Sequence, residues 1–163
     1  MTKFHLRTFL SNSFTRRTLL AVVLMALSSA LLCAQSASTI PAGVLVQPDA
    51  LHSELLVNPH ATLILQVGSR MLFDEAHIPG AEYAGPASTP AGLGVLRTRV
   101  NSLSRAASIV LYCGCCPWSH CPNIAPAWNL LHDMGFSSVR VLYIANNFGT
   151  DWVAHGYGAE RSQ

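Results

Sequence analysis

Four of the five cysteines in this 163-residue chain lie within nine positions, in the stretch IVLYCGCCPWSHCPN at residues 109–123. A run of apolar residues leads straight into Cys113, and Cys115, Cys116 and Cys121 follow. Sulfur at this density suits three kinds of chemistry: a nucleophile that carries sulfur as a persulfide, a dithiol redox centre, or a metal or disulfide cluster.

Cys113 is the candidate nucleophile because it ends an apolar run, residues 108–113, that predicts a buried strand. A thiol attacks sulfur as the thiolate, and an unperturbed cysteine has a pKa of about 8.5. A loop that curls from a strand end into a helix start points backbone N–H groups at its centre, and the helix dipole adds partial positive charge. We therefore expect the loop that begins at Gly114 to stabilise a thiolate or persulfide anion at Cys113.

A dithiol centre is the second interpretation of the cluster. Cys113 and Cys116 have the C-x-x-C spacing of redox dithiols, and this spacing precedes a predicted helix. A disulfide between the neighbours Cys115 and Cys116 would be strained, so pairing to Cys121 or Cys113 is more natural. In an oxidising compartment we expect one disulfide among Cys115, Cys116 and Cys121.

Metal binding is the third interpretation, with three or four of the loop's cysteines and His120 around copper or zinc. Structural zinc sites usually split their ligands into two separated pairs, and this tight cluster does not, so a metal site is not the expected one. The non-catalytic alternative is a binding module in which a disulfide holds the loop in place. Trp118 would then face a partner, whereas in an enzyme it would shield the thiolate.

The elements around the cluster predict how Cys113 is positioned. Continuous apolar runs at residues 62–67 and 108–113 predict buried strands. Residues 138–144 predict a third strand, and residues 43–46 predict a short first strand. Helices are expected at 47–57, 69–77, 90–103 and 123–136, with a short last one at 149–157. In the first of these, Leu51, Leu55 and Leu56 should share a buried face, and Asn123 should cap the fourth.

Strands that alternate with helices predict an α/β fold with a parallel central sheet and helices on both faces. In such sheets ligands bind beyond the carboxyl ends of the strands, which is where Cys113 is expected.

Several segments together resemble the rhodanese-like domains. LILQVGSRMLFDEAHIPGAEY (63–83) is similar to the family's strand, turn, short helix and His-Ile-Pro-Gly-Ala turn, which begins here at His77. IVLYC resembles the strand that delivers the family's catalytic cysteine, with Cys113 at the matching position. LLHDMGFSSVRVL and the closing DWVAHGY also match, so the resemblance covers residues 43–160. It implies a sulfurtransferase in which Cys113 takes sulfane sulfur from a small donor and passes it to a thiol or another thiophilic acceptor, with no cofactor.

Two departures from the family pattern qualify that expectation. Gln66 stands where the family usually has an acid, and the loop after Cys113 is longer than usual. Residues 114–122 hold three further cysteines and no arginine or lysine, so His120 is the loop's own source of positive charge, mostly below pH 7. The same absence argues against a phosphatase, which needs an arginine to clamp phosphate. A dianionic donor such as thiosulfate is disfavoured for the same reason.

The N-terminal residues 1–36 are expected to be a signal peptide, because a basic segment is followed by the apolar run TLLAVVLMALSSALL. Arg16 and Arg17 resemble a twin-arginine signal, which would export the folded protein to a bacterial periplasm. Leu32 stands where a lipoprotein signal has a small residue, so we expect no lipid anchor at Cys33. Removal of the signal would leave residues 37–163 as one domain without stable membrane association.

The charge balance limits the partners. Residues 37–163 contain six arginines, no lysine and eight acids, so the basic balance of the whole chain, +2, comes from the predicted signal. Without a basic patch there is no case for nucleic acid. A small sulfur donor and a thiol acceptor are the expected partners.

Overall fold

The computed structural model describes residues 40–162, so the predicted signal peptide and Cys33 lie outside the described part. Five parallel strands form one sheet in the order β1-β5-β4-β2-β3. Their bounds are β1 (Leu45–Val46), β2 (Leu63–Gln66), β3 (Glu82–Tyr83), β4 (Ile109–Tyr112) and β5 (Val139–Leu142). The strand that leads to Cys113, β4, is therefore at the centre of the sheet.

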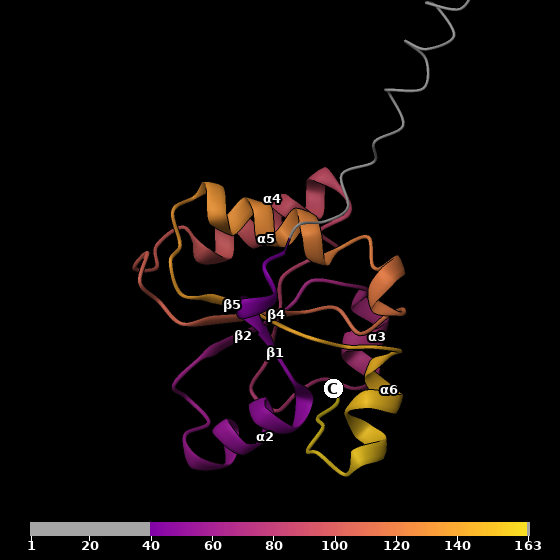
Figure 1. The fold of residues 1–163 in the computed structure, drawn as a ribbon. Helices are drawn as coiled ribbons and strands as arrows, with labels where there is room; N and C mark the ends of the chain where they lie inside the picture. The colour runs from indigo at the N-terminus through magenta and orange to yellow at the C-terminus, as the bar shows by residue number, and fades with distance from the viewer. Residues whose placement is uncertain (1–39, 163) are drawn as a thin grey trace, which may run out of the picture. The chain divides into compact units, whose positions relative to one another are not determined.

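Helices cover both faces of the sheet, as expected (Figure 1). One face carries α4 (Pro90–Val100) and α5 (Ile124–Asp133), and the other carries α2 (Pro48–Val57), α3 (Arg70–Glu75) and α6 (Phe148–Asp151). Short 3-10 turns complete the fold at η2 (Ala42–Val44), η3 (Trp118–His120) and η4 (Val153–His155).

Strand β4 is buried on both faces because its side chains alternate between the two helix layers. Ile109 and Leu111 pack in the core beneath α4 and α5, and Cys113 continues this alternation. Val110 and Tyr112 pack in the second core, with α2, α3 and α6. The same periodicity that buries the strand thus turns the Cys113 side chain toward the α4–α5 layer.

The helix starts follow their sequence signals. Pro48 lies in the first turn of α2, and Pro90 in that of α4, where a missing N–H costs nothing. The hydroxyl of Thr89 caps α4 by accepting a bond from the N–H of Gly92, 3.0 Å away.

Three predictions about helices and strands are wrong in detail. Leu56 is 72% exposed, so the buried stripe of α2 consists of Leu51 with the half-buried Leu55. Asn123 precedes α5 but makes no capping bond, because its side chain is engaged elsewhere. Residues 42–44 form a 3-10 turn, so the first strand starts at Leu45. None of the helices within residues 40–162 has the length and apolar character needed to span a bilayer.

Candidate active site

Cys113 directly follows the central strand and lies at the carboxyl edge of the sheet, as predicted. It is buried, with 4% of its surface exposed. Gly68, two residues past the end of the neighbouring strand β2, leaves the space that the Cys113 sulfur occupies, since a Cβ at that position would lie 2.8 Å from the Cys113 Sγ. The tight Gly68 turn is therefore part of the site.

Two buried amide side chains hold Cys113. Gln66 donates from Nε2 to the carbonyl oxygen of Cys113 at 3.2 Å, and its Oε1 accepts from the N–H of Gly68 at 3.1 Å. Asn123 donates from Nδ2 to the Cys113 Sγ at 3.3 Å, and its Oδ1 accepts from the N–H of Ser88 at 2.9 Å. Asn123 thus fixes the sulfur itself, while Gln66 fixes the backbone.

The loop after Cys113 is tied to the chain beyond β5. Gly114 has φ +73, and its carbonyl accepts from the N–H of Phe148 at 3.0 Å. A Cβ at Gly114 would lie 2.7 Å from the Cβ of Phe148, so both the backbone angle and the space require glycine. Trp118 donates its backbone N–H to Ala145 at 3.2 Å, and its half-buried ring packs against Tyr143.

Three sulfur atoms converge at the site. The Sγ atoms of Cys113, Cys115 and Cys121 lie within 4.8 Å of one another, and those of Cys113 and Cys115 are 3.1 Å apart. Cys116 contacts Cys115 at 3.2 Å but lies outside this group. The four loop cysteines are free thiols, so the predicted disulfide is not formed in this structure. The same grouping of three sulfurs would suit a metal ion that prefers thiolates, so the third interpretation stays open.

The backbone N–H groups of the loop stabilise negative charge on Cys121, whereas from the sequence we expected them to stabilise it on Cys113. A hydrogen bond to Cys121 and burial raise the pKa of the Cys113 thiol far above its ordinary value. The hydrogen bond from Cys113, with the backbone N–H groups of Asn123 and Ile124, lowers the pKa of Cys121 to about 6. The loop amides and the neighbouring sulfur therefore favour a thiolate at Cys121 and a protonated thiol at Cys113. Burial raises the pKa of Cys116 to about 12.

A cavity of about 520 Å³ opens beside Cys113. Cys113, Gly114 and Cys115 form one wall. Residues of α3, α6, η4 and the C-terminal segment, including Glu75 and Arg161, line the cavity together with the strand-end residues Gln66 and Tyr112. Arg161 reaches the cavity because the C-terminal segment returns to the site, where Glu160 and His77 exchange two backbone hydrogen bonds of 2.9 Å. Arg161 gives the cavity a cation that the loop lacks.

No protein-family model matches this sequence, and no curated protein matches it. Solved structures do match. The crystal structure of the Alr3790 protein from Anabaena sp. aligns at a TM-score of 0.56 and 26% identity, over 71% of this chain and 82% of that one. A solution structure of the rhodanese-like domain of the same protein aligns at 0.54 and 25%, over 72% and 79%. The chain is a rhodanese-like domain.

Two further structures share the fold of this rhodanese-like domain. BH2092 from Bacillus halodurans aligns at a TM-score of 0.55 and 18% identity, over 72% of this chain and 76% of that one. EanB, solved in complex with hercynine, aligns at 0.51 and 21%, over 72% of this chain and only 27% of EanB. The cysteine cluster after β4 thus lies in a fold that smaller and larger proteins share.

The residues predicted around Cys113 separate into two groups in the rhodanese-like domain. Gly114, Cys115 and Cys121 surround Cys113, with Cys116 and the half-buried Trp118 in the next layer. His120 is exposed, and its ring pairs with the hydroxyl of Ser119 at 2.8 Å, away from the three-sulfur group. His120 is therefore not the cation of the site.

Sequence reasoning missed the parts that Gln66, Asn123 and Arg161 play. Gln66 stood out as a departure from the family, but nothing in the sequence showed that its amide would bridge two backbone groups. Asn123 was expected to cap a helix, and its ten-residue separation from Cys113 gave no sign of a bond to sulfur. Arg161 carries no sequence signal, because a chain end that returns to the sheet is a tertiary feature.

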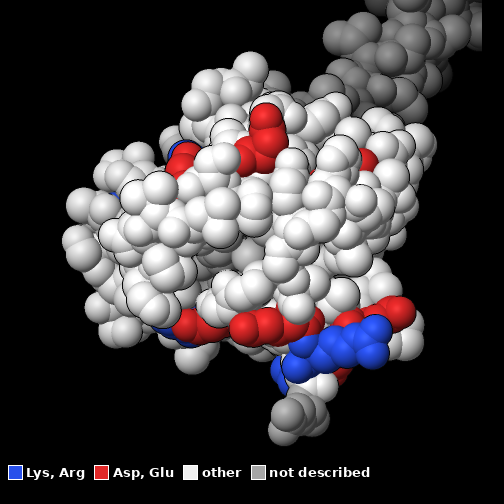
Figure 2. Space-filling model, turned by 90° about the horizontal axis from the view of Figure 1, so that it is seen from below, with Lys and Arg blue, Asp and Glu red and all other residues white. Residues whose placement is uncertain are grey.

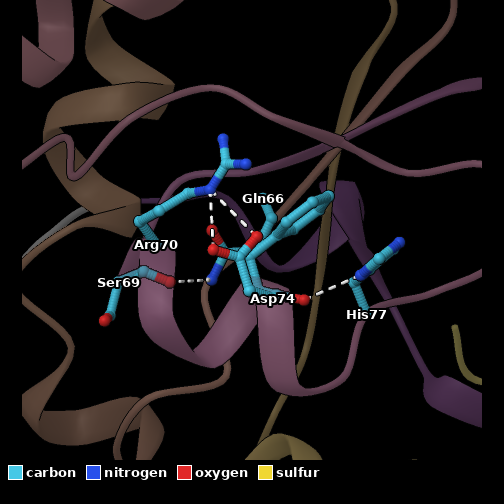
Figure 3. Close-up of polar contacts among 6 residues, drawn as sticks. Gln66, Ser69, Arg70, Asp74 and His77 are labelled. Carbon is cyan, nitrogen blue, oxygen red and sulfur yellow. Dashed lines mark hydrogen bonds and ion pairs between the residues drawn. The ribbon is translucent and has the colours of Figure 1, made fainter. Parts of the chain in front are cut away.

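The turn and helix after β2 are structural neighbours of the site. Figure 3 shows Arg70 directed at Asp74, with hydrogen bonds of 2.9 and 3.0 Å, and Gln66 bonded to the carbonyl of Ser69. The ring of the buried His77 bonds to the carbonyl of Phe73 at 2.7 Å, so it orders the turn. Charged groups are sparse, and most of the face in Figure 2 is uncharged.

Proposed function

We propose that this rhodanese-like domain is a sulfurtransferase in which Cys113 carries sulfane sulfur as a persulfide. The observation that carries the proposal is the position of Cys113, which forms the wall of the 520 Å³ cavity and belongs to the three-sulfur group behind it. A small donor in the cavity would lie beside Cys113 at the end of the central strand. A thiol acceptor would use the same opening, and neither step needs a cofactor.

The neighbouring groups support each stage of such a reaction. Cys113 attacks the sulfane sulfur of the donor, its proton passes to the Cys121 thiolate, and the remainder of the donor leaves with the bonding electron pair. The Asn123 amide, 3.3 Å from the Cys113 Sγ, donates to the sulfur that changes charge. The outer sulfur of the persulfide then passes to an acceptor thiolate, which restores the Cys113 thiolate.

The test measures sulfur on Cys113. The protein is mixed with thiosulfate, with the persulfide of a small thiol or with polysulfide, and an excess of thiol acceptor is added. We expect sulfide release above the uncatalysed rate, and Cys113→Ser should abolish it while circular dichroism shows an intact fold. Cys116→Ser is the matched control and should retain most of the rate. Equal rates for the wild-type protein and Cys113→Ser with all three donors would end the proposal.

A dithiol oxidoreductase that uses Cys113 and Cys116 gives a different result in the same set of variants. Both serine substitutions would then be equally damaging, and a protein disulfide such as insulin would be reduced without sulfur transfer. The position of Cys116 outside the three-sulfur group favours the sulfurtransferase.

We also propose that the protein is exported to a bacterial periplasm after removal of residues 1–36. The support is the basic segment and apolar run of the sequence. Mass spectrometry of the native protein should find a start near residue 37 and a location outside the cytoplasm. Replacement of Arg16 and Arg17 by Lys should block export if the twin-arginine route is used, whereas an intact N-terminus in the cytoplasm would contradict export.

A further inference from the structure

Cys113 lies between two cavities of very different size. The cavity of about 520 Å³ is lined by Cys113 and Cys115, whereas a separate one of about 10 Å³ is lined by Cys113, Cys116 and Cys121. The small cavity has room for no more than about one water molecule. No external thiol fits there, so the chemistry on that side of Cys113 belongs to the protein's own sulfurs.

We propose that Cys121 is a resolving nucleophile that attacks the Cys113 persulfide, releases its outer sulfur as hydrosulfide and leaves a Cys113–Cys121 disulfide. This inference rests on the proposed function, because it needs sulfur on Cys113. It changes the outcome of the reaction from transfer to reduction: sulfane sulfur enters and sulfide leaves.

Position favours Cys121 for this role. Its Sγ lies within 4.8 Å of the Cys113 Sγ, so a small side-chain movement brings the two into bonding contact. The backbone N–H groups of Asn123 and Ile124 are directed at the Cys121 sulfur, where they would stabilise negative charge as it attacks. Cys121 also lines the small cavity and not the large one, so a donor molecule does not stand between the two sulfurs.

Cys115 is closer to Cys113 but is less suited to resolve it. Their Sγ atoms are 3.1 Å apart, yet only Gly114 separates the two residues, and a disulfide across one residue closes a small, strained ring. The loop from Cys113 to Cys121 spans nine residues and closes without that strain. Cys115 lines the large cavity, where a donor would contact it.

The step balances within the protein. Cys121 first passes the proton that it took from Cys113 during loading to the donor's leaving group. Its thiolate then attacks the inner sulfur, the Cys113 Sγ, so the Cys113–Cys121 bond forms and the bond to the outer sulfur breaks. The outer sulfur takes the electron pair and leaves as hydrosulfide with the persulfide's proton. Over loading and release together, one sulfane sulfur is reduced while two cysteine sulfurs are oxidised. An external dithiol reductant must then reopen the disulfide.

The experiment separates this step from loading of Cys113. Reduced protein is desalted without oxygen, mixed with one equivalent of the persulfide of a small thiol, and desalted again. The wild-type protein should release about one equivalent of sulfide, become lighter by about 2 Da, and show a Cys113–Cys121 link on peptide mapping. Cys121→Ser should instead keep about 32 Da of extra mass on Cys113 and release about tenfold less sulfide.

Cys116→Ser is the control, since it lines the same small cavity and should behave as the wild-type protein does. A wild-type protein that keeps the added sulfur on Cys113, or that links Cys113 to Cys115, would overturn the role of Cys121 and leave the sulfurtransferase proposal standing. If neither the wild-type protein nor Cys121→Ser gains sulfur on Cys113 or releases sulfide, the sulfurtransferase proposal fails and this inference fails with it.

Discussion

Arg161 shows how a single residue from the end of the described chain alters the chemistry expected of the loop. The loop itself lacks lysine and arginine, which argued against a dianionic donor. The fold returns Arg161 to the 520 Å³ cavity, beside the wall that Cys113 forms. An exposed arginine attracts an anion weakly, and Glu75 lines the same cavity with the opposite charge, so the effect of Arg161 on an anionic donor should be modest.

Arg161→Ala should therefore weaken the use of anionic donors more than of neutral ones. We expect the KM for thiosulfate to rise about two- to fivefold, the range that exposed ion pairs allow, with little change in the KM for a neutral trisulfide. Arg97→Ala, an exposed position of α4 outside the cavity, is the control and should change neither. Steady-state kinetics with the two donors measures these KM values. An equal rise in KM for both donors would count against Arg161 as a contact of the anion.

Gln66 is a second residue whose role depends on paired hydrogen bonds. Gln66→Leu would leave the Cys113 carbonyl and the Gly68 N–H without partners at a buried strand end, so unfolding should become easier by about 2 to 3 kcal/mol. Gln47→Leu is the matched control, because Gln47 is exposed and makes no capping bond, and its effect should stay within about 0.5 kcal/mol. Urea unfolding measures both, and similar losses would mean that the bonds of Gln66 contribute little.

At the scale of elements, two glycines of α4 have opposite surroundings. A Cβ on Gly92 would lie 2.0 Å from the carbonyl oxygen of Pro86, so only glycine lets the helix approach the segment after β3. Gly94, two residues on, has open space around it. The helix is thus weakened by two glycines, of which the packing requires one.

Alanine at these two positions should change stability in opposite directions. Gly92→Ala must push α4 away from backbone atoms and should cost at least about 3 kcal/mol, as overpacking against a rigid neighbour does. Gly94→Ala should stabilise the protein by up to about 1 kcal/mol through the better helix propensity of alanine. Thermal unfolding of the two variants is the measurement, and a shift of the same sign in both would refute the close approach.

The sequence predicted elements better than contacts. The strands at 62–67 and 108–113 were identified correctly because a fully buried strand is a continuous apolar run, and this pattern is local. Cys113 followed from the same pattern together with the rule for strand ends. Leu56 and Asn123 were misjudged because exposure and side-chain partners depend on neighbouring segments. The sequence could not predict whether the loop's backbone N–H groups point at Cys113 or at Cys121, because that depends on the path of the loop.

At the scale of the whole molecule, three cysteines should make stability depend on pH. Cys121 has a pKa of about 6 in the folded protein and about 8.5 when unfolded, so between these values the unfolded chain holds a proton that the fold has lost. The free energy of unfolding should therefore rise from pH 6 to pH 8.5. Above pH 8.5 it should fall, because the raised pKa values of Cys113 and Cys116 keep protons on the folded protein that the unfolded chain releases.

Urea unfolding in the presence of reductant, at pH 6, 7, 8.5 and 10, measures this dependence. Cys121→Ser should remove the rise between pH 6 and 8.5. It should also reduce the fall above pH 8.5, because Cys121 contributes to the raised pKa of Cys113, but burial should keep part of that fall. A rise of unchanged size in Cys121→Ser would assign it to other groups of the protein.

The lengths of the two edge strands limit how readily separate molecules can pair through their sheets. The two outermost strands, β1 and β3, contain two residues each, whereas the inner three contain four. A short edge offers few unpaired backbone N–H and C=O groups to a strand of another molecule, and β3 also carries the Glu82 side chain, which is paired with Arg99. The sheet is therefore a poor template for edge-to-edge aggregation, so concentrated solutions of the folded domain should resist fibril formation even though its central strands are continuous apolar runs.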